Sequence, residues 1–148
     1  MKEVTGNLWT FHAQYLPIVI TTNGDVRRDG ACVMGRGVAR QAANRYPKLP
    51  YSIGDKIKHY GNHAFSFACS ESQIIFTFPV KHHWSELADI KLITRSCDEL
   101  ILQLSYWRFT EIYMPRPGCG NGGLTWDVVR PIIAEKLDDR FTICEINP

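Results

Sequence analysis

The spacing of hydrophobic and polar residues predicts both buried strands and amphipathic helices. Residues 17–22 (PIVITT) form a continuous β-branched run, which is typical of a strand covered on both faces. Residues 86–105 have helical spacing instead, with apolar side chains at Leu87, Ile90, Ile93, Cys97, Leu100, Ile101 and Leu104. A chain that carries both periods must pack helices against a sheet.

The remaining segments complete an alternating order of strands and helices. The predicted helices are residues 38–46, 86–105 and 127–133, and the predicted strands are residues 2–5, 17–22, 63–69, 73–78, 109–113 and 140–146. A polar turn joins the third and fourth strands into a hairpin that we expect to end at Pro79. Residues 51–61 contain Gly54 and show little periodicity, so they predict a loop with one short strand. This order predicts an α/β fold, a mixed central sheet sandwiched by helices in three α/β/α layers.

Two glycine-bearing segments each stand between a strand and a helix. The first covers residues 31–37, and the second covers residues 114–126 (MPRPGCGNGGLTW) with four glycines in six residues. Glycine allows positive φ and a close approach of the backbone, and N–H groups ahead of a helix suit a phosphate. A turn that only reverses the chain is the alternative. Because ligands of such sheets bind at the carboxyl ends of strands, we expect the loops to form opposite walls of one cleft.

Composition and charge exclude several classes of protein. The 148 residues carry a formal net charge of +2 and are 45% hydrophobic, which fits one domain with a real core and argues against a strongly basic DNA scaffold. The five cysteines are scattered without a CxxC pair, which argues against a disulfide framework and a structural zinc site. The sequence has neither an export signal nor an apolar run of about eighteen residues, so we expect a cytoplasmic protein without a membrane span.

Lys81 has the clearest chemical potential of the polar residues. It follows a buried strand and is flanked by Pro79, His82, His83 and Trp84. An amine partly removed from water beside aromatic and imidazole groups can act as a nucleophile or base. From its spacing alone, a solvated loop lysine is the more frequent case.

Other polar residues offer weaker candidates. Asn23 ends a buried strand and could either contact a sugar hydroxyl or form a turn with Gly24. Cys119 lies in the second glycine loop near a helix start, where a thiol of low pKa is a candidate, although no histidine or acid is placed beside it in sequence. Adjacent His82 and His83 lack further ligands at metal spacing, so no metal site is predicted.

Four segments together resemble the macro domain family, which binds ADP-ribose. They are GNL at residues 6–8, VMGRGVARQAANRYP at 33–47, FTFPVKHHW at 76–84 and MPRPGCGNGGLTW at 114–126. Within the family, the chain most resembles the branch of lysine-dependent ADP-ribosyl glycohydrolases that includes the DNA ADP-ribosyl glycohydrolase antitoxins, which carry similar FPxKxHW and GCGNGGLxW segments. The resemblance covers nearly the whole chain and implies a single macro domain over residues 1–148.

The resemblance also implies a role for each matched residue. Lys81 matches the catalytic lysine, whose amine would attack or polarise the anomeric carbon of the distal ribose, through a Schiff base or by proton transfer. Asn7, beside Leu8, stands where an aspartate usually meets adenine, and Asn23 matches the asparagine at the distal ribose. The other implied ADP-ribose-binding residues are Pro79 and the two loops, Val33, Met34, Gly35, Arg36, Gly37, Val38, Gly118, Cys119, Gly120, Asn121, Gly122, Gly123 and Leu124.

Two departures from the family pattern refine this expectation. Residues 26–30 lengthen the segment before the first loop, which leaves the geometry of Asn23 and Asp25 open. Gly122 stands where a human-type relative has an aspartate that assists its lysine, so an antitoxin-like arrangement is favoured over a carboxylate-assisted one.

Taken together, these roles imply an ADP-ribosyl hydrolase without a metal or organic cofactor. It would remove ADP-ribose from a DNA base or from an acidic side chain of a protein. The alternatives are a module that binds ADP-ribose without turnover and a phosphatase acting on ADP-ribose 1″-phosphate, whose relatives share GN near the start and RYPK at residues 45–48. The expected partners are ADP-ribosylated DNA or protein and a paired ADP-ribosyltransferase toxin. The expected oligomeric state is a monomer.

Overall fold

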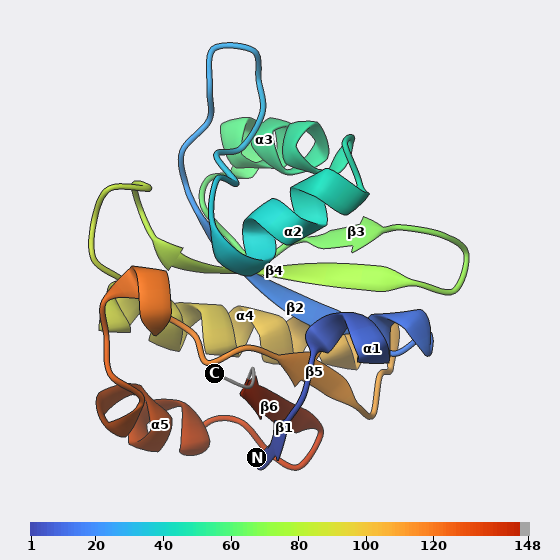
Figure 1. Cartoon of the computed structure of the whole chain (residues 1–148), viewed down its shortest axis with the longest axis vertical. Coiled ribbons are helices and arrows are strands. Elements are labelled where there is room, and N and C mark those ends of the chain that lie inside the picture. The colour runs from blue at the N-terminus through green and yellow to red at the C-terminus, as the bar shows by residue number, and fades with distance from the viewer. Residues whose placement is uncertain (146–148) are drawn as a thin grey trace.

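The strands form one mixed sheet, as the sequence pattern predicts (Figure 1). In the computed structural model, which describes residues 1–145, they are β1 (Lys2–Thr5), β2 (Ile18–Asn23), β3 (Ser66–Ala68), β4 (Ile74–Lys81), β5 (Ile112–Met114) and β6 (Phe141–Glu145). Their order across the sheet is β1-β6-β5-β2-β4-β3, and β3 runs antiparallel to β4 while the other pairs are parallel. Residues 146–148 of the predicted domain lie outside the described residues, and residue 146 is also the end of the last predicted strand.

Helices cover both faces of this sheet. They are α1 (Leu8–Ala13), α2 (Gly37–Arg45), α3 (Leu49–Tyr60), α4 (Ile90–Trp107) and α5 (Trp126–Ala134), with a short 3-10 helix η1 (Gly120–Gly122). One hydrophobic cluster packs α1, α2 and α3 on one face, and a second cluster packs α4 and α5 on the other. The predicted three-layer α/β/α arrangement is therefore confirmed.

The central strands β2 and β4 supply side chains to both clusters. In β2, Ile18 and Ile20 belong to the cluster of α1 to α3, whereas Val19 belongs to the cluster of α4 and α5. In β4, every residue before Lys81 is buried. Successive side chains of a strand point to opposite faces, and both faces are covered here, so an uninterrupted apolar run is what these strands require.

Helix α3 corrects the prediction of a loop at residues 51–61. Its buried residues are Leu49, Ile53 and Gly54, and Pro50 lies in its first turn. The i, i+4 spacing of the two apolar side chains and the early proline were the missed signals. Gly54 suggested a loop because glycine is a poor helix former. In the fold, glycine is required there by close packing, since a Cβ would lie 2.0 Å from the carbonyl oxygen of Gly30.

One further helix and one helix boundary differ from the prediction. Helix α1 was not predicted; Asn7 caps it, and the Asn7 side chain accepts a hydrogen bond from the Trp9 N–H at 2.9 Å. Helix α4 begins at Ile90 rather than at residue 86, because Asp89 caps it and accepts from the Lys91 N–H at 2.9 Å. Leu87 consequently lies outside the helix and is 71% exposed.

Strand β4 continues past Pro79, where the sequence predicted its end. Thr22 of β2 pairs with Pro79, but the next residue, Asn23, pairs with Lys81, so a bulge places one extra residue in β4. The buried Ser96 hydroxyl of α4 donates to the Pro79 carbonyl oxygen at 2.7 Å. A bulge redirects the side chains that follow it, and here it sets Lys81 opposite Asn23.

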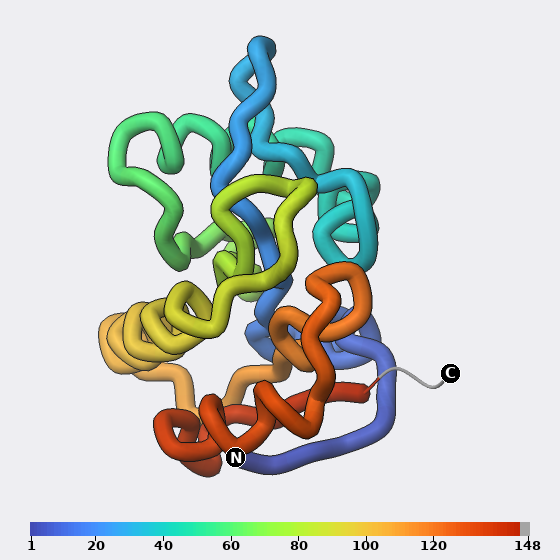
Figure 2. The backbone as a smooth tube through the Cα atoms, turned by 90° about the vertical axis from the view of Figure 1, so that its left-hand side faces the viewer, coloured from blue at the N-terminus to red at the C-terminus, as the bar shows by residue number. Residues whose placement is uncertain are grey.

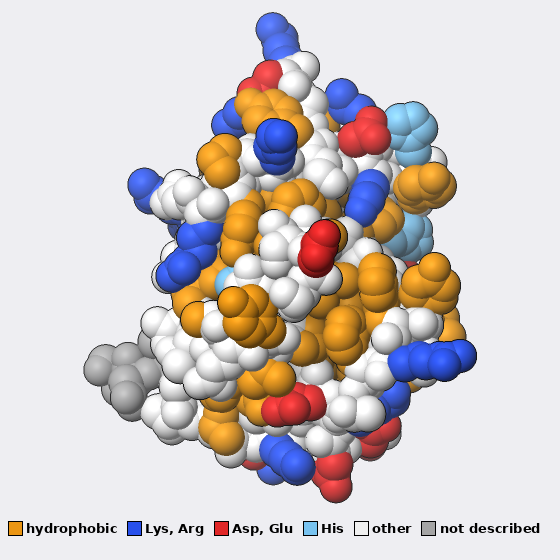
Figure 3. Space-filling view, turned by 90° about the vertical axis from the view of Figure 1, so that its right-hand side faces the viewer, with side chains coloured by type: hydrophobic (Ala, Val, Ile, Leu, Met, Phe, Trp, Pro, Cys, Tyr) orange, Lys and Arg blue, Asp and Glu red, His pale blue; other side chains and the backbone are white. Residues whose placement is uncertain are grey.

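Large hydrophobic side chains also remain on the surface, away from the sheet. Figure 3 shows the side of the molecule on which α1 and the end of α4 lie in Figure 1, and hydrophobic side chains gather across its middle. The exposed residues of these two segments include Tyr15, Leu102, Tyr106 and Trp107. Within the described part of the chain, no helix combines the length and apolar character that crossing a membrane requires.

Replacing Gly54 with alanine should destabilise the protein. The added methyl group would meet the Gly30 carbonyl oxygen at 2.0 Å and the Cys32 backbone nitrogen at 2.9 Å, and neither backbone atom can turn away. We expect Gly54→Ala to lower the free energy of unfolding by about 1–3 kcal/mol or more, measured by urea denaturation. Gly35→Ala is the matched control, because no heavy atom lies within 4 Å of a Cβ there. Equal stability of the two variants would contradict the packing role of Gly54.

Candidate functional site

A cleft of about 510 Å³ opens at the carboxyl ends of β2 and β4. Figure 2 faces this rim, where the yellow-green loop after β4 lies close to the orange second glycine loop. Four segments line the cleft: the end of β2, the first glycine loop with the first turn of α2, the end of β4 with its loop, and the second glycine loop. The lining residues are Thr21, Thr22, Asn23, Val33, Met34, Gly35, Arg36, Gly37, Val38, Ala39, Val80, Lys81, Trp84, Pro115, Arg116, Gly118, Cys119, Gly120, Asn121 and Gly122.

Most of the residues singled out in the sequence meet in this cleft. Asn23, Lys81, residues 33–38 and residues 118–122 are all part of its lining. The lining does not include Asn7, Leu8, Pro79, Gly123 or Leu124, so their contacts with a ligand remain predictions. For Asn7 and Leu8 the fold gives another use, since Asn7 caps α1 and Leu8 is buried at 2% exposure.

The two glycine loops face each other across the cleft, as predicted. Gly37 has φ of 57°, and a Cβ there would lie 3.4 Å from the side-chain amide nitrogen of Asn121. Gly118 has φ of 78°, and its Cβ would lie 2.8 Å from Ile93 Cδ1 of α4. Positive φ and tight packing together require glycine at Gly118, so this residue fixes the second loop against the core.

The first turn of α2 brings backbone donors without intrahelical partners to one wall of the cleft. Arg36 is the N-cap of α2 and makes no side-chain capping bond to its first turn, which lines the cleft through Gly37, Val38 and Ala39. The first N–H groups of a helix have no partner within the helix. They therefore offer hydrogen bonds and a partial positive charge to an anion.

Lys81 places its ammonium between the two sides of the cleft. Its Nζ donates to the carbonyl oxygen of Trp84 at 3.3 Å and to that of Asn121 at 3.1 Å. Among the described residues, no carboxylate lies within ion-pair distance of this nitrogen. The Lys81 amine is thus held at the rim by neutral acceptors that a substrate atom could replace.

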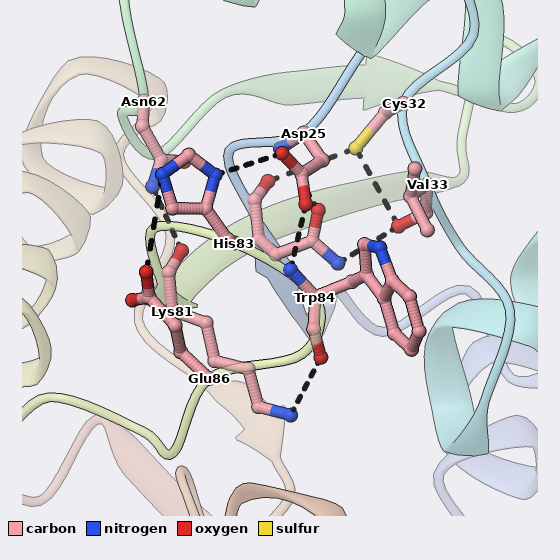
Figure 4. A network of polar contacts seen from close by, with 9 residues as sticks. Asp25, Cys32, Val33, Asn62, Lys81, His83, Trp84 and Glu86 are labelled. Carbon is pink, nitrogen blue, oxygen red and sulfur yellow. Dashed lines mark hydrogen bonds and ion pairs between the residues drawn. The ribbon is translucent and has the colours of Figure 1, made fainter. Parts of the chain in front are cut away.

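A polar network fixes the loop that follows Lys81 (Figure 4). One oxygen of the Asp25 carboxylate accepts from His83 Nδ1 at 2.9 Å, and the other accepts from the Trp84 N–H at 2.7 Å. The Asn62 side chain donates to the Lys81 carbonyl oxygen at 3.0 Å. The Trp84 peptide is therefore anchored on its N–H side by Asp25 and approached on its carbonyl side by the Lys81 ammonium.

Asn23 positions the first glycine loop from within. Its side-chain amide donates to the Val33 carbonyl oxygen at 3.0 Å, and its Oδ1 accepts from the Asp25 N–H at 3.0 Å. The Val33 N–H in turn donates to the Asp25 carbonyl oxygen at 2.9 Å. Asn23 lines the cleft, as the sequence suggested. It also connects the end of β2 to the first glycine loop, so the positions of Asn23 and Asp25, which the longer segment 26–30 left open, are defined by these hydrogen bonds.

The Asp25–His83 contact perturbs both titrations. Burial alone would raise the pKa of Asp25, but hydrogen bonds from His83 and from the Trp84 N–H, with the nearby imidazolium charge, lower it below the ordinary 3.8. The same hydrogen bond and the carboxylate charge raise the pKa of His83 above 6.5. Both side chains are therefore charged over a pH range that begins below 3.8 and ends above 6.5.

The structure overturns the suggestion of a low-pKa thiol at Cys119. Burial raises the pKa of Cys119 above 9.0, and its Sγ donates weakly to the Pro117 carbonyl oxygen at 3.8 Å. The nearby Arg116 charge opposes this shift without reversing it. A desolvated neutral thiol is a poor nucleophile, so Cys119 is a wall of the cleft.

The charge of the lining favours an anion. Arg36, Lys81 and Arg116 are its cationic residues, and none of the lining residues in the described part of the chain is an aspartate or glutamate. Arg116 is held by Glu145 at 3.1 Å and lies over the Trp126 ring at 4.8 Å from its centroid. Within residues 1–145 there is also no cluster of three or more histidine, cysteine and acidic side chains placed to hold a metal ion.

Sequence reasoning missed three residues that matter here. The sequence places Trp84 beside Lys81 on the expected rim but assigns it no role, it does not single out Arg116, and it indicates for Asp25 only an open loop geometry. Trp84 and Arg116 lie inside the FPVKHHW and MPRPGCGNGG motifs, which was the available signal. Asp25 carried none, because its partners lie 58 and 59 residues away in the chain.

The Asp25–His83 pair should make stability depend on pH in a defined way. The raised pKa of His83 means that its contribution is complete below pH 6.5 and is lost as the pH rises through the raised value. The lowered pKa of Asp25 means that its contribution is present above 3.8 and is lost as the pH falls through the lowered value. We expect the stability difference between wild type and His83→Gln to be largest between these limits and to shrink at about pH 8.5, measured by urea denaturation.

A double-mutant cycle separates this pair from the other ionisable groups. The coupling between His83→Gln and Asp25→Asn should be favourable at about pH 5.5 and should fall toward zero at about pH 8.5. A coupling that did not change between these pH values would show that the contact makes no ionic contribution.

Comparison with known proteins gives relatives over most of the chain. No protein-family model matches the sequence. A DNA ADP-ribosyl glycohydrolase of Thermus aquaticus is 26% identical over 93% of this chain. A DNA ADP-ribosyl transferase-DNA ADP-ribosyl glycohydrolase fusion protein of Thermosipho africanus is 23% identical over 93% of it. The chain spans 38% and 39% of the length of these two relatives.

Solved structures match the fold over nearly the whole chain. The macrodomain of Mycobacterium tuberculosis DarG superposes with a TM-score of 0.78 at 25% identity, covering 99% of this chain and 97% of that one. Thermosipho africanus DarTG in complex with ADP-ribose superposes with a TM-score of 0.79 at 21% identity, covering 98% of this chain and 41% of that one.

Proposed function

Because the chain has the macro domain fold of these relatives, we propose that it is an ADP-ribosyl hydrolase that acts with Lys81. It would hold ADP-ribose in the cleft and remove it from a modified macromolecule. The observation that carries the proposal is the cleft itself: two glycine walls, the backbone donors of the first turn of α2, two arginines and the Lys81 amine at the rim, with no acidic residue among its described lining.

The diphosphate of ADP-ribose suits the space between the two walls. The first turn of α2 lies on one side and η1 on the other, and both walls contain glycines at which the backbone can approach closely. Arg36, Lys81 and Arg116 add positive charge to the same space. Two phosphates placed there would meet N–H groups and cations, one of which, Arg116, also pairs with Glu145 outside the lining.

Lys81 would then act on the distal ribose. The bond that breaks joins the anomeric carbon to the attached group, and the net reaction consumes one water, whose hydroxyl ends on that carbon and whose proton ends on the departing group. Two carbonyl oxygens at 3.1 and 3.3 Å hold the Lys81 amine and fix its direction toward the cleft. Because both acceptors are neutral, an oxygen of the substrate can take the place of either hydrogen bond.

A nucleobase in DNA is the macromolecular target we favour. The relatives named DNA ADP-ribosyl glycohydrolases support it, and the exposed arginines Arg28, Arg36 and Arg40, of which Arg36 lines the cleft, would supply positive charge to the phosphates of a strand. The Thermosipho africanus fusion protein supports a paired ADP-ribosyltransferase as the partner that makes the substrate. A cytoplasmic location is part of the same proposal.

Removing the Lys81 amine should abolish turnover while keeping ligand binding. We expect Lys81→Ala to lower kcat on an oligonucleotide carrying ADP-ribose on a thymine base by about 100-fold or more, since the loss of a positioned acid, base or nucleophile costs about that much. Free ADP-ribose should still bind, as measured by calorimetry, because the first turn of α2 and both arginines of the lining remain. Lys48→Ala, which changes an exposed lysine outside the cleft, is the matched control.

Three outcomes would reassign the protein. ADP-ribose binding without turnover of base-linked or ester-linked substrates would make it a binding module. Phosphate release from ADP-ribose 1″-phosphate at a rate unaffected by Lys81→Ala would make it a phosphatase. Equal binding of ADP-ribose, ADP and NAD would point to a general nucleotide site.

A further inference from the structure

The indole of Trp84 is exposed to solvent in the same cleft as the Lys81 amine. The residue is 55% exposed and lines the same cleft as Lys81. Figure 4 shows the Trp84 indole beside Val33, while the Trp84 carbonyl oxygen faces the Lys81 ammonium. The indole and the Lys81 amine therefore border the same ligand space.

Packing does not account for the position of the indole. Trp84 belongs to neither hydrophobic cluster, and within the described chain its ring has no aromatic or cationic partner. Exposure of an indole forgoes the stabilisation that its burial would supply. The indole therefore contributes little to the stability of the folded state.

The backbone of Trp84, in contrast, is fixed from both sides. Its N–H donates to Asp25 at 2.7 Å, and its carbonyl oxygen accepts from Lys81 Nζ at 3.3 Å. Asp25 is itself held by His83 at 2.9 Å. Because the peptide is already fixed, only the side-chain torsions of Trp84 lose freedom when a ligand packs on the ring.

We propose that Trp84 is a specificity-determining residue whose indole stacks on a planar heteroaromatic group attached to the distal ribose. This rests on the proposed function, because it concerns the group that Lys81 would release. A nucleobase offers a flat π-face to the ring, whereas the ester of an acidic side chain offers none. Trp84 therefore selects base-linked over ester-linked ADP-ribose, and Asp25 and His83 position it.

Binding to the Lys81→Ala variant, which keeps the hydrogen bond from the Trp84 N–H to Asp25, tests this selection without requiring turnover. In that background, Trp84→Ala should weaken the affinity for an oligonucleotide with ADP-ribose on a thymine base by about tenfold and change that for ADP-ribose by less than about twofold, since stacking acts only on the base. Affinity for an ester-linked ADP-ribosylated peptide should follow free ADP-ribose. Calorimetry or fluorescence titration gives all three values.

Two variants control for indirect effects. Trp84→Phe retains a stacking face and should restore most of the affinity for the modified oligonucleotide. Trp107→Ala removes another partly exposed indole, 42% exposed at the end of α4 and outside the cleft, and should leave all affinities unchanged.

Equal weakening of all three ligands by Trp84→Ala would overturn the proposal, because the indole would then serve ADP-ribose itself or the fold. No weakening of any ligand would overturn it as well. Failure of the hydrolase proposal looks different: a wild-type protein that turns over neither linkage removes the catalytic role of Lys81, while the affinity difference caused by Trp84→Ala still decides the selection.

Discussion

The parallel pairing of β2 with β4 is the constraint on which the site depends. Both strands are buried on two faces, so their register is fixed by the two hydrophobic clusters that pack on them. The bulge at the end of this pair sets Asn23 opposite Lys81. A one-residue change of register would turn Lys81 toward the core of α4 and α5, where an amine has no partner.

From this pair, hydrogen bonds extend the order of the sheet into the loops. Asn23 holds the first glycine loop through Val33, and Asp25 holds the loop after β4 through Trp84. The second glycine loop is tied to the same region because the Ala88 N–H donates to the Gly122 carbonyl oxygen at 2.9 Å. The same contact explains Gly122, since a Cβ there would lie 3.1 Å from Ala88 Cβ. An aspartate at this position would therefore require the neighbouring loop to shift.

The parts of the fold that could be predicted are those in which local pattern and tertiary environment agree. The apolar runs of β2 and β4 and the periodicity of α4 were sufficient, because each requires burial that only one kind of element provides. Glycine-rich segments between strands and helices were enough to predict two opposed walls, and the family resemblance directed attention to Lys81.

The rest depended on contacts between distant residues. Helix α3 was missed because Gly54, a poor helix former, is required by the close approach of the Gly30 backbone. The predicted start of α4 was wrong because the loop that precedes it is held by the Gly122 and Val80 carbonyl oxygens rather than by helical bonds. Asp25 was overlooked because its role arises only when the fold brings β2 beside the loop after β4.

A crystal structure of the Lys81→Ala variant with ADP-ribose tests the central claim most directly, because it shows which group of the ligand each wall receives. The account predicts the diphosphate between the first turn of α2 and η1, with the anomeric carbon of the distal ribose facing the position of the missing amine. A ligand bound with its adenine at that position, or outside the cleft, would contradict the account.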